Sequence, residues 1–151
     1  MNISIPDSMK HTTTYESGVA QATAYRVVKK ITAQALKKYD LTCMQWFTIG
    51  MVLTTGDKGI RLTDLAHRLD TTLAYATNTV NLLESRKILT RTAHGTDGRI
   101  KNINVVPSYI ATCDDIEKEV RDTLRHLLYA NMTPGELHTY TRVLYKMSSL
   151  K

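Results

Sequence analysis

The chain has 151 residues, of which 42% are hydrophobic and 23% charged, and this length fits one globular domain. No apolar run approaches the roughly 18 to 20 residues of a membrane span, and two cysteines are too few for a disulfide scaffold. The 20 Lys and Arg against 14 Asp and Glu give a net charge of +6, which suits an acidic partner such as nucleic acid.

The first two predicted elements are helices. Residues 15–38 form a long amphipathic helix, because apolar side chains recur there at steps of four, three and four. These positions are Ala24, Val28, Ile31 and Ala35. Thr42 with Gln45 three places on is a capping box that begins a second helix, and residues 44–53 behind it are largely apolar. We expect this second helix to be central and buried.

The next segment predicts a helix-turn-helix. Residues 56–59 end the second helix, residues 60–62 are extended, and Thr63 caps a brief third helix. Thr71 or Thr72 can cap a fourth helix, whose inward positions recur at steps of three, four and three: Leu73, Ala76, Val80 and Leu83. Two short helices joined by a tight turn make a helix-turn-helix.

A basic hairpin follows. Alternation with period two over residues 89–93 and 101–105 predicts two antiparallel strands, and residues 94–99 contain the glycines of a hairpin tip. A hairpin after a helix-turn-helix is a winged helix. Residues 86–101 carry five basic groups against one acidic group, a local net charge of +4. We favour phosphate contact for this cluster over the alternative of a merely solvated sheet edge.

The carboxyl third returns to helix. Apolar residues repeat at steps of three and four from Ile110 to Leu127, and Thr133 with Glu136 caps a last helix. The apolar positions of that last helix are Leu137, Tyr140, Leu144 and Met147. A small winged lobe cannot cover these faces together with the first helix. We therefore expect them to pack against their equivalents in a two-fold dimer.

Four local strings, in this order, resemble the MarR family of winged-helix transcription regulators. They are Leu41-Thr42 with Gln45-Trp46, residues 61–69, residues 82–89, and Asp97-Gly98-Arg99. The likeness covers nearly the whole chain. It implies an obligate dimer on a pseudo-palindromic operator, with the fourth helix in the major groove and the wing in the minor groove. By position, Arg99 resembles the arginine of the family's wing, and Asp97 the acid that steadies it.

The chain departs from the family at two points. Lys87 stands where a glycine usually follows the fourth helix, which predicts a tight or strained helix exit. No Lys or Arg occurs from Thr71 to Ser85, so the fourth helix cannot make bidentate arginine contacts to guanine. Asn can pair with adenine, and Thr or Ala can touch the thymine methyl group. The operator is therefore predicted to lean toward A and T.

The predicted DNA-binding residues lie on the fourth helix and the wing. They are Thr72, Ala74, Tyr75, Thr77, Asn78, Asn81, Arg86, Arg91, His94, Arg99 and Lys101. Asp97 is predicted to stabilise the wing. For Asn78 and Asn81 we favour base contact over the alternative that they are only polar residues of an exposed face.

The resemblance also implies that small effectors lodge between the dimer helices and the winged lobe. The candidate pocket residues are Tyr39, Cys43, Met44 and Trp46. The alternative, that Trp46 belongs to the core, is the commoner case. Cys43 stands in the first turn of the second helix, where the helix dipole would lower the thiol pKa if the sulfur were exposed. We favour a buried, inert thiol there, and a packing role for Cys113.

No catalytic, metal or cofactor site is expected, because the sequence has no GxSxG, P-loop, GxGxxG or close histidine pattern. The predicted fold is mainly α: a winged helix-turn-helix lobe over residues 41–106 and a helical dimerisation region over residues 10–38 and 108–151.

The predicted function is a dimeric, sequence-specific, double-stranded DNA-binding transcription regulator, for which we favour a repressor over the alternative of an activator. A small aromatic or anionic effector, or thiol oxidation, is expected to release it from its operator. The polar start, residues 1–9, lacks a secretory pattern and predicts the cytoplasm. The alternative is a winged-helix protein-interaction module without DNA binding, which the basic wing disfavours.

Overall fold

The computed structural model describes residues 12–94 and 97–150, apart from the side chains of residues 94 and 97–100. The order of elements confirms the predicted winged helix. The described helices and strands are α1 (Thr14–Leu36), α2 (Cys43–Leu53), α3 (Leu62–Arg68), α4 (Leu73–Ser85), β1 (Leu89–His94), β2 (Asp97–Val105), α5 (Ile110–Leu127) and α6 (Pro134–Ser148). Short 3-10 turns at Lys37–Tyr39, Gly56–Lys58 and Pro107–Tyr109 join several of them.

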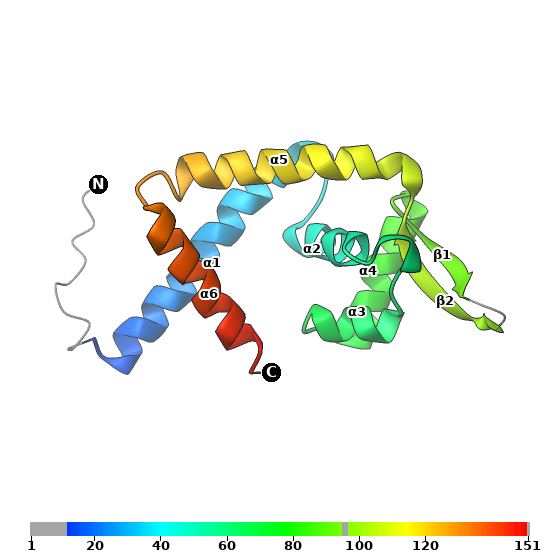
Figure 1. Ribbon diagram of the computed structural model, residues 1–151, viewed down its shortest axis with the longest axis horizontal. Helices are drawn as coiled ribbons and strands as arrows, with labels where there is room; N and C mark the ends of the chain where they lie inside the picture. Colours follow the sequence, from blue (N-terminus) through cyan, green and yellow to red (C-terminus); the bar gives the residue numbers. More distant parts are fainter. Residues whose placement is uncertain (1–11, 95–96, 151) are drawn as a thin grey trace.

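The molecule has a winged lobe at one end and two long helices at the other (Figure 1). Helix α5 runs from the wing to α6, and α1 packs against it. The Lys38 ammonium lies 2.7 Å from Glu119 and joins α1's continuation to α5. Helices α2, α3 and α4 with the β1–β2 hairpin form the lobe, so α5 connects that lobe to the end where α1 and α6 cross in this view.

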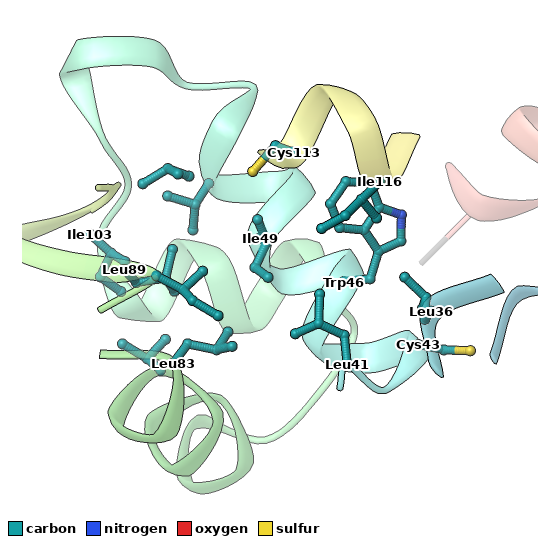
Figure 2. Close-up of a cluster of buried hydrophobic side chains, with 14 of the residues drawn as sticks. Leu36, Leu41, Cys43, Trp46, Ile49, Leu83, Leu89, Ile103, Cys113 and Ile116 are labelled. Carbon is teal, nitrogen blue, oxygen red and sulfur yellow. The ribbon is translucent and has the colours of Figure 1, made fainter. Parts of the chain in front are cut away.

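One hydrophobic cluster holds the winged lobe to α1 and α5 (Figure 2). Every element except α6 supplies at least one of its almost fully buried side chains: Leu36, Ile49, Leu65, Leu83, Leu89, Ile103 and Ile116. Burying a side chain of this size stabilises the fold by about 1.5 to 3 kcal/mol. The core therefore fixes where α4 and the wing stand relative to α1 and α5.

Helix α6 has no buried residue in the single chain. Its predicted apolar positions Tyr140, Leu144 and Met147 are 38%, 46% and 52% exposed. Large apolar side chains also stand exposed along α1, among them Tyr15, Val19, Tyr25 and Val27. The long helices thus carry apolar surface that one chain leaves uncovered, as the sequence predicts.

Three helices begin with the same reciprocal cap. The predicted boxes at Thr42 with Gln45 and at Thr133 with Glu136 are confirmed, because each threonine hydroxyl accepts from the N3 backbone N–H and each N3 side chain accepts from the threonine N–H. Helix α1 has a third box, Thr13 with Glu16. Residues 12–14 are poor helix formers, which obscured this start in the sequence.

Two local predictions were wrong. Helix α3 begins at Leu62 with Arg61 as its N-cap, because the backbone pair between Ile60 and Ile103 ends the extended segment before Thr63. Leu73 was predicted to point inward, but it is 50% exposed, because it is the first residue of α4 and precedes the turn that packs on the lobe. Thr79 is buried instead, beside Ala76 and Val80.

The hairpin is longer than predicted and tied to the helix-turn-helix. Strand β2 already begins at Asp97, and Leu89 pairs with Val105 at the base. The Asn102 amide donates to the Lys58 carbonyl at 2.7 Å, and Ile60 exchanges backbone hydrogen bonds of 3.0 and 2.8 Å with Ile103. These contacts hold the base of the wing at a fixed place beside α3.

Lys87 adopts the left-handed conformation, with φ of 57°. Its N–H donates to the Glu84 carbonyl at 2.9 Å, and the Ile88 N–H donates to the Leu83 carbonyl at 2.9 Å. This is a Schellman motif, in which glycine is favoured because it has no Cβ to clash. The strain predicted at the exit of the fourth helix is therefore present as an unfavourable backbone conformation.

Replacing Lys87 with glycine should stabilise the protein by about 0.5 to 1 kcal/mol, because it relieves the left-handed conformation of a residue with a side chain. The check is the urea midpoint at one fixed protein concentration. Lys58→Gly is the control, since Lys58 is an exposed lysine without a positive φ. If both variants shift the midpoint alike, backbone strain at Lys87 is not the cause.

Candidate nucleic-acid interface

The outward face of α4 is polar and uncharged. Ala74, Tyr75, Asn78 and Asn81 are exposed, and Thr77 is half-buried. The Thr72 hydroxyl accepts the Tyr75 N–H at 3.1 Å and so caps the helix, as predicted. Among the described residues, the Asn78 side chain has no hydrogen-bond partner. Its amide is therefore able to present a donor and an acceptor together, which is the pattern that matches adenine in a major groove.

Asn81 is engaged by the wing. Arg91, on β1, reaches across to α4, where its guanidinium forms an ion pair with Glu84 and donates to Asn81 Oδ1 at 2.8 Å. The Arg91 side chain is 25% exposed. Three side chains from two elements thus form one cluster, and the charge of Arg91 is balanced within the protein.

Arg86 contacts the turn that follows α1. It donates to the Asp40 carbonyl at 2.7 Å and to the Tyr39 carbonyl at 3.3 Å, and it lies 3.7 Å from the Asp40 carboxylate. These bonds tie the carboxyl end of α4 to the turn between α1 and α2. Arg86 therefore lies apart from Asn81 and Arg91, and it links the helix-turn-helix to the long helices.

The predicted wing residues are described in part. Lys101 is exposed on β2, opposite Ala93 of β1. Residues 94, 97 and 99 belong to the strands by their backbone, whereas the side chains of His94, Asp97 and Arg99 lie outside the description. Lys101 is thus the predicted wing contact whose exposure is established.

Two exposed arginines on α3 were missing from the predicted set. Arg61, the N-cap residue, and Arg68, at the last turn, are both exposed and line one groove of about 560 Å³. Their spacing of seven residues places them on the same side of a helix. That spacing, together with the basic excess before residue 101, was the available signal in the sequence.

The four predicted pocket residues lie in or against the core. Trp46 and Cys43 are buried, and Trp46 lies beside Ile116 of α5 (Figure 2). Tyr39 and Met44 are half-buried. The Cys43 thiol lies 3.4 Å from the Lys29 carbonyl, and burial raises its pKa. The thiolate is therefore scarce at neutral pH, and burial likewise raises the pKa of Cys113, to about 11.

A groove of about 670 Å³ opens next to this region, where α1, α2 and α4 meet. Its basic lining residues are Lys30, Lys37 and Arg86, and its apolar ones include Leu41 and Leu82. Arg86 belongs both to this groove and to the tie between α4 and the turn after α1. A molecule bound in the groove would therefore touch a residue that positions α4.

The described ranges contain neither a cluster of three or more potential metal ligands nor a helix long and apolar enough to cross a bilayer. What the described residues do form is a surface of amide, hydroxyl and basic side chains on α3, α4 and β1, a chemistry suited to binding rather than to catalysis.

The chain is similar to several solved protein structures, whereas no family model and no curated protein matches it. MepR of S. aureus, in its complex with DNA, is similar at 25% identity and a TM-score of 0.73, over 93% of this chain and 100% of that one. Apo MarR from E. coli is similar at 19% identity and a TM-score of 0.70, over 86% and 95%. AbsC, a MarR family transcriptional regulator from Streptomyces coelicolor, shares 14% identity over 91% and 95%, with a TM-score of 0.74.

Proposed function

Because the chain belongs to the MarR family of winged-helix transcription regulators, we propose that it is a dimeric repressor that binds a pseudo-palindromic, A/T-leaning duplex in a sequence-specific way. It is a DNA-binding transcription regulator rather than an enzyme. In this proposal residues 41–106 read the DNA, and residues 10–38 and 108–151 join the two subunits.

The observation that carries the proposal is the exposed amide face of α4. Asn78 and Asn81 can hydrogen-bond base edges in the major groove, while Ala74 and the methyl group of Thr77 suit the methyl group of thymine. Thr72 and Tyr75 stand at the amino end of the same helix, where they can contact the phosphate backbone of the DNA. The similarity to MepR, solved in complex with DNA, supports DNA binding by this chain.

Phosphate contacts are assigned to basic side chains around α4. Lys101 on the wing and Arg61 and Arg68 on α3 are exposed. His94 and Arg99 complete the proposed wing contacts, with Asp97 as the acid that steadies them. Arg86 and Arg91 are assigned a positioning role instead, because their guanidinium groups contact the Asp40 carbonyl and Glu84 respectively. A wing arginine would favour a narrow, A/T-rich minor groove.

The dimer is proposed from apolar surface. A lone chain leaves large side chains of α1 and α6 exposed, and exposed apolar surface of this kind marks an interaction site. The proposed occupant is a second copy of the same helices, because a two-fold operator requires two equal lobes. Each lobe would then read one half-site.

Release of the operator is assigned to a small anion with an apolar body, such as an aromatic carboxylate. The groove between α1, α2 and α4 combines Lys30, Lys37 and Arg86 with Leu41 and Leu82, which suits both parts of such a ligand. Binding there would act on the Arg86 tie to the turn after α1. Thiol oxidation is the weaker version, because Cys43 is buried and its pKa is raised.

The test is selection of bound duplexes from a random pool by the purified protein. A repeated motif with half-sites about 10 base pairs apart, and an affinity that falls as salt rises, is expected. Aromatic carboxylates should release the bound duplex, whereas peroxide should not. Absence of enrichment together with a salt-independent affinity would favour the protein-interaction module.

A further inference from the structure

Arg91 links Asn81, which is proposed to read a base, to Glu84. The Arg91 guanidinium forms an ion pair with Glu84 and a hydrogen bond with Asn81. Glu84 and Asn81 are three residues apart on α4, so both side chains lie on one side of the helix. Arg91 approaches them from β1, and its guanidinium contacts both. Glu84 is 37% exposed and Arg91 25%, so the ion pair is partly screened from water.

The chemistry of the guanidinium determines how the Asn81 amide is oriented. An arginine carries donors and no acceptor. The atom that faces it at 2.8 Å must therefore be the carbonyl oxygen of Asn81, and the amide NH₂ group points elsewhere. Turning the amide over would set two donors against each other and lose a charge-assisted hydrogen bond.

We propose that Arg91 is a positioning residue that turns the NH₂ group of Asn81, rather than its carbonyl oxygen, toward DNA. The inference rests on the proposed function, in which α4 enters the major groove. An amide that presents its NH₂ group can donate to guanine O6 or N7, adenine N7 or thymine O4, whereas the amino group of cytosine offers it no acceptor. Asn78, which has no such clamp, keeps the donor and acceptor pair that adenine requires.

Two asparagines on one helix would thus read different bases. Asn78 supplies the predicted A/T preference, and Asn81 adds one position per half-site where a base with a major-groove acceptor is favoured over cytosine. This positioning role also explains why Arg91, an arginine beside the helix proposed to read DNA, is paired within the protein. Glu84 balances the charge of Arg91, and Arg91 contributes to binding by orienting Asn81.

The experiment compares base preferences of the full-length wild type with those of Asn81→Ala, Arg91→Ala and Arg121→Ala, each selected against the same random duplex pool. Arg121→Ala is the matched control, because it breaks an exposed arginine-glutamate pair, with Glu117 at 2.7 Å, on α5. Asn81→Ala identifies the base pair that Asn81 reads. Thermal unfolding verifies that each variant is folded at the selection temperature.

The expected result is confined to that base pair. Wild type should disfavour cytosine there by about tenfold, which is within the range of one base contact. Arg91→Ala should reduce this discrimination at least about threefold and leave the preference at the Asn78 position unchanged. Arg121→Ala should match the wild type at every position. A loss of overall stability alone would lower all preferences together.

The outcomes separate the two levels of the proposal. If wild type selects no motif, the proposed function fails and this inference fails with it. If wild type selects a motif but Arg91→Ala retains the full discrimination at the Asn81 base pair, the clamp is wrong and the proposed function stands. If Arg91→Ala weakens operator and scrambled duplex equally, Arg91 is a phosphate contact and the inference is also overturned.

Discussion

The double variant Tyr140→Asp with Leu144→Asp should be monomeric at micromolar concentration and bind operator duplex about 10² to 10⁴ times more weakly than wild type. The two side chains are four residues apart on α6 and are exposed in the single chain. Carboxylates at the centre of an apolar interface lose hydration without gaining a partner. A monomer engages one half-site, and so loses the effective concentration that links the two lobes.

Light scattering is the measurement, with wild type expected near twice the 17.0 kDa chain mass and the variant near that mass. Ser108→Asp with Ala111→Asp is the control, because it adds the same charge at exposed positions before and within the first turn of α5, near the wing. The control should remain dimeric. A wild type that scatters as a single chain at these concentrations would contradict the dimer outright.

The second prediction distinguishes a residue that contacts bases from one that contacts phosphates. Asn78→Ala should weaken binding to the operator by roughly 1 to 3 kcal/mol, relax the preference at one base pair per half-site, and hardly change binding to scrambled duplex. Asn78 is exposed on α4 and its amide is the group proposed to pair with adenine. The loss should therefore appear where that adenine is present.

Lys101→Ala should behave differently, because Lys101 is a charge on the wing rather than a base contact. It should weaken binding to operator and scrambled duplex alike and reduce the salt slope by about one unit, since one fewer counterion is released. The measurement is a set of binding curves on both duplexes at several salt concentrations. If Asn78→Ala and Lys101→Ala give the same uniform loss, α4 is not the reading element.

Helix starts and the wing could be predicted because their signals are local. Thr42 with Gln45 and Thr133 with Glu136 are three residues apart, and the alternation of the hairpin lies within two short runs. The start of α3 was misplaced because a distant residue decides it. Ile103 pairs with Ile60 and ends the extended segment before Thr63, the better side-chain cap, is reached.

The bonds of the basic residues could not be read from spacing. Arg91 meets Asn81 ten positions back, and Arg86 meets the Tyr39 carbonyl 47 positions back. Both contacts arise when β1 and the α1–α2 turn pack against α4. Charge counting treats every arginine near the wing as a phosphate contact, whereas the folded chain engages Arg86 and Arg91 internally.

The three capping boxes give the two ends of the molecule a different response to acid. The boxes of α1 and α6 use Glu16 and Glu136, whereas that of α2, in the winged lobe, uses Gln45, which does not titrate. The hydrogen bonds from Thr13 and Thr133 lower the pKa of both carboxyl groups. Their stabilising effect is present above the ordinary value of 4.5 and is lost as the pH falls through the lowered folded value. Acidification is therefore expected to fray the starts of α1 and α6 while the cap of α2, which has no titratable side chain, stays intact.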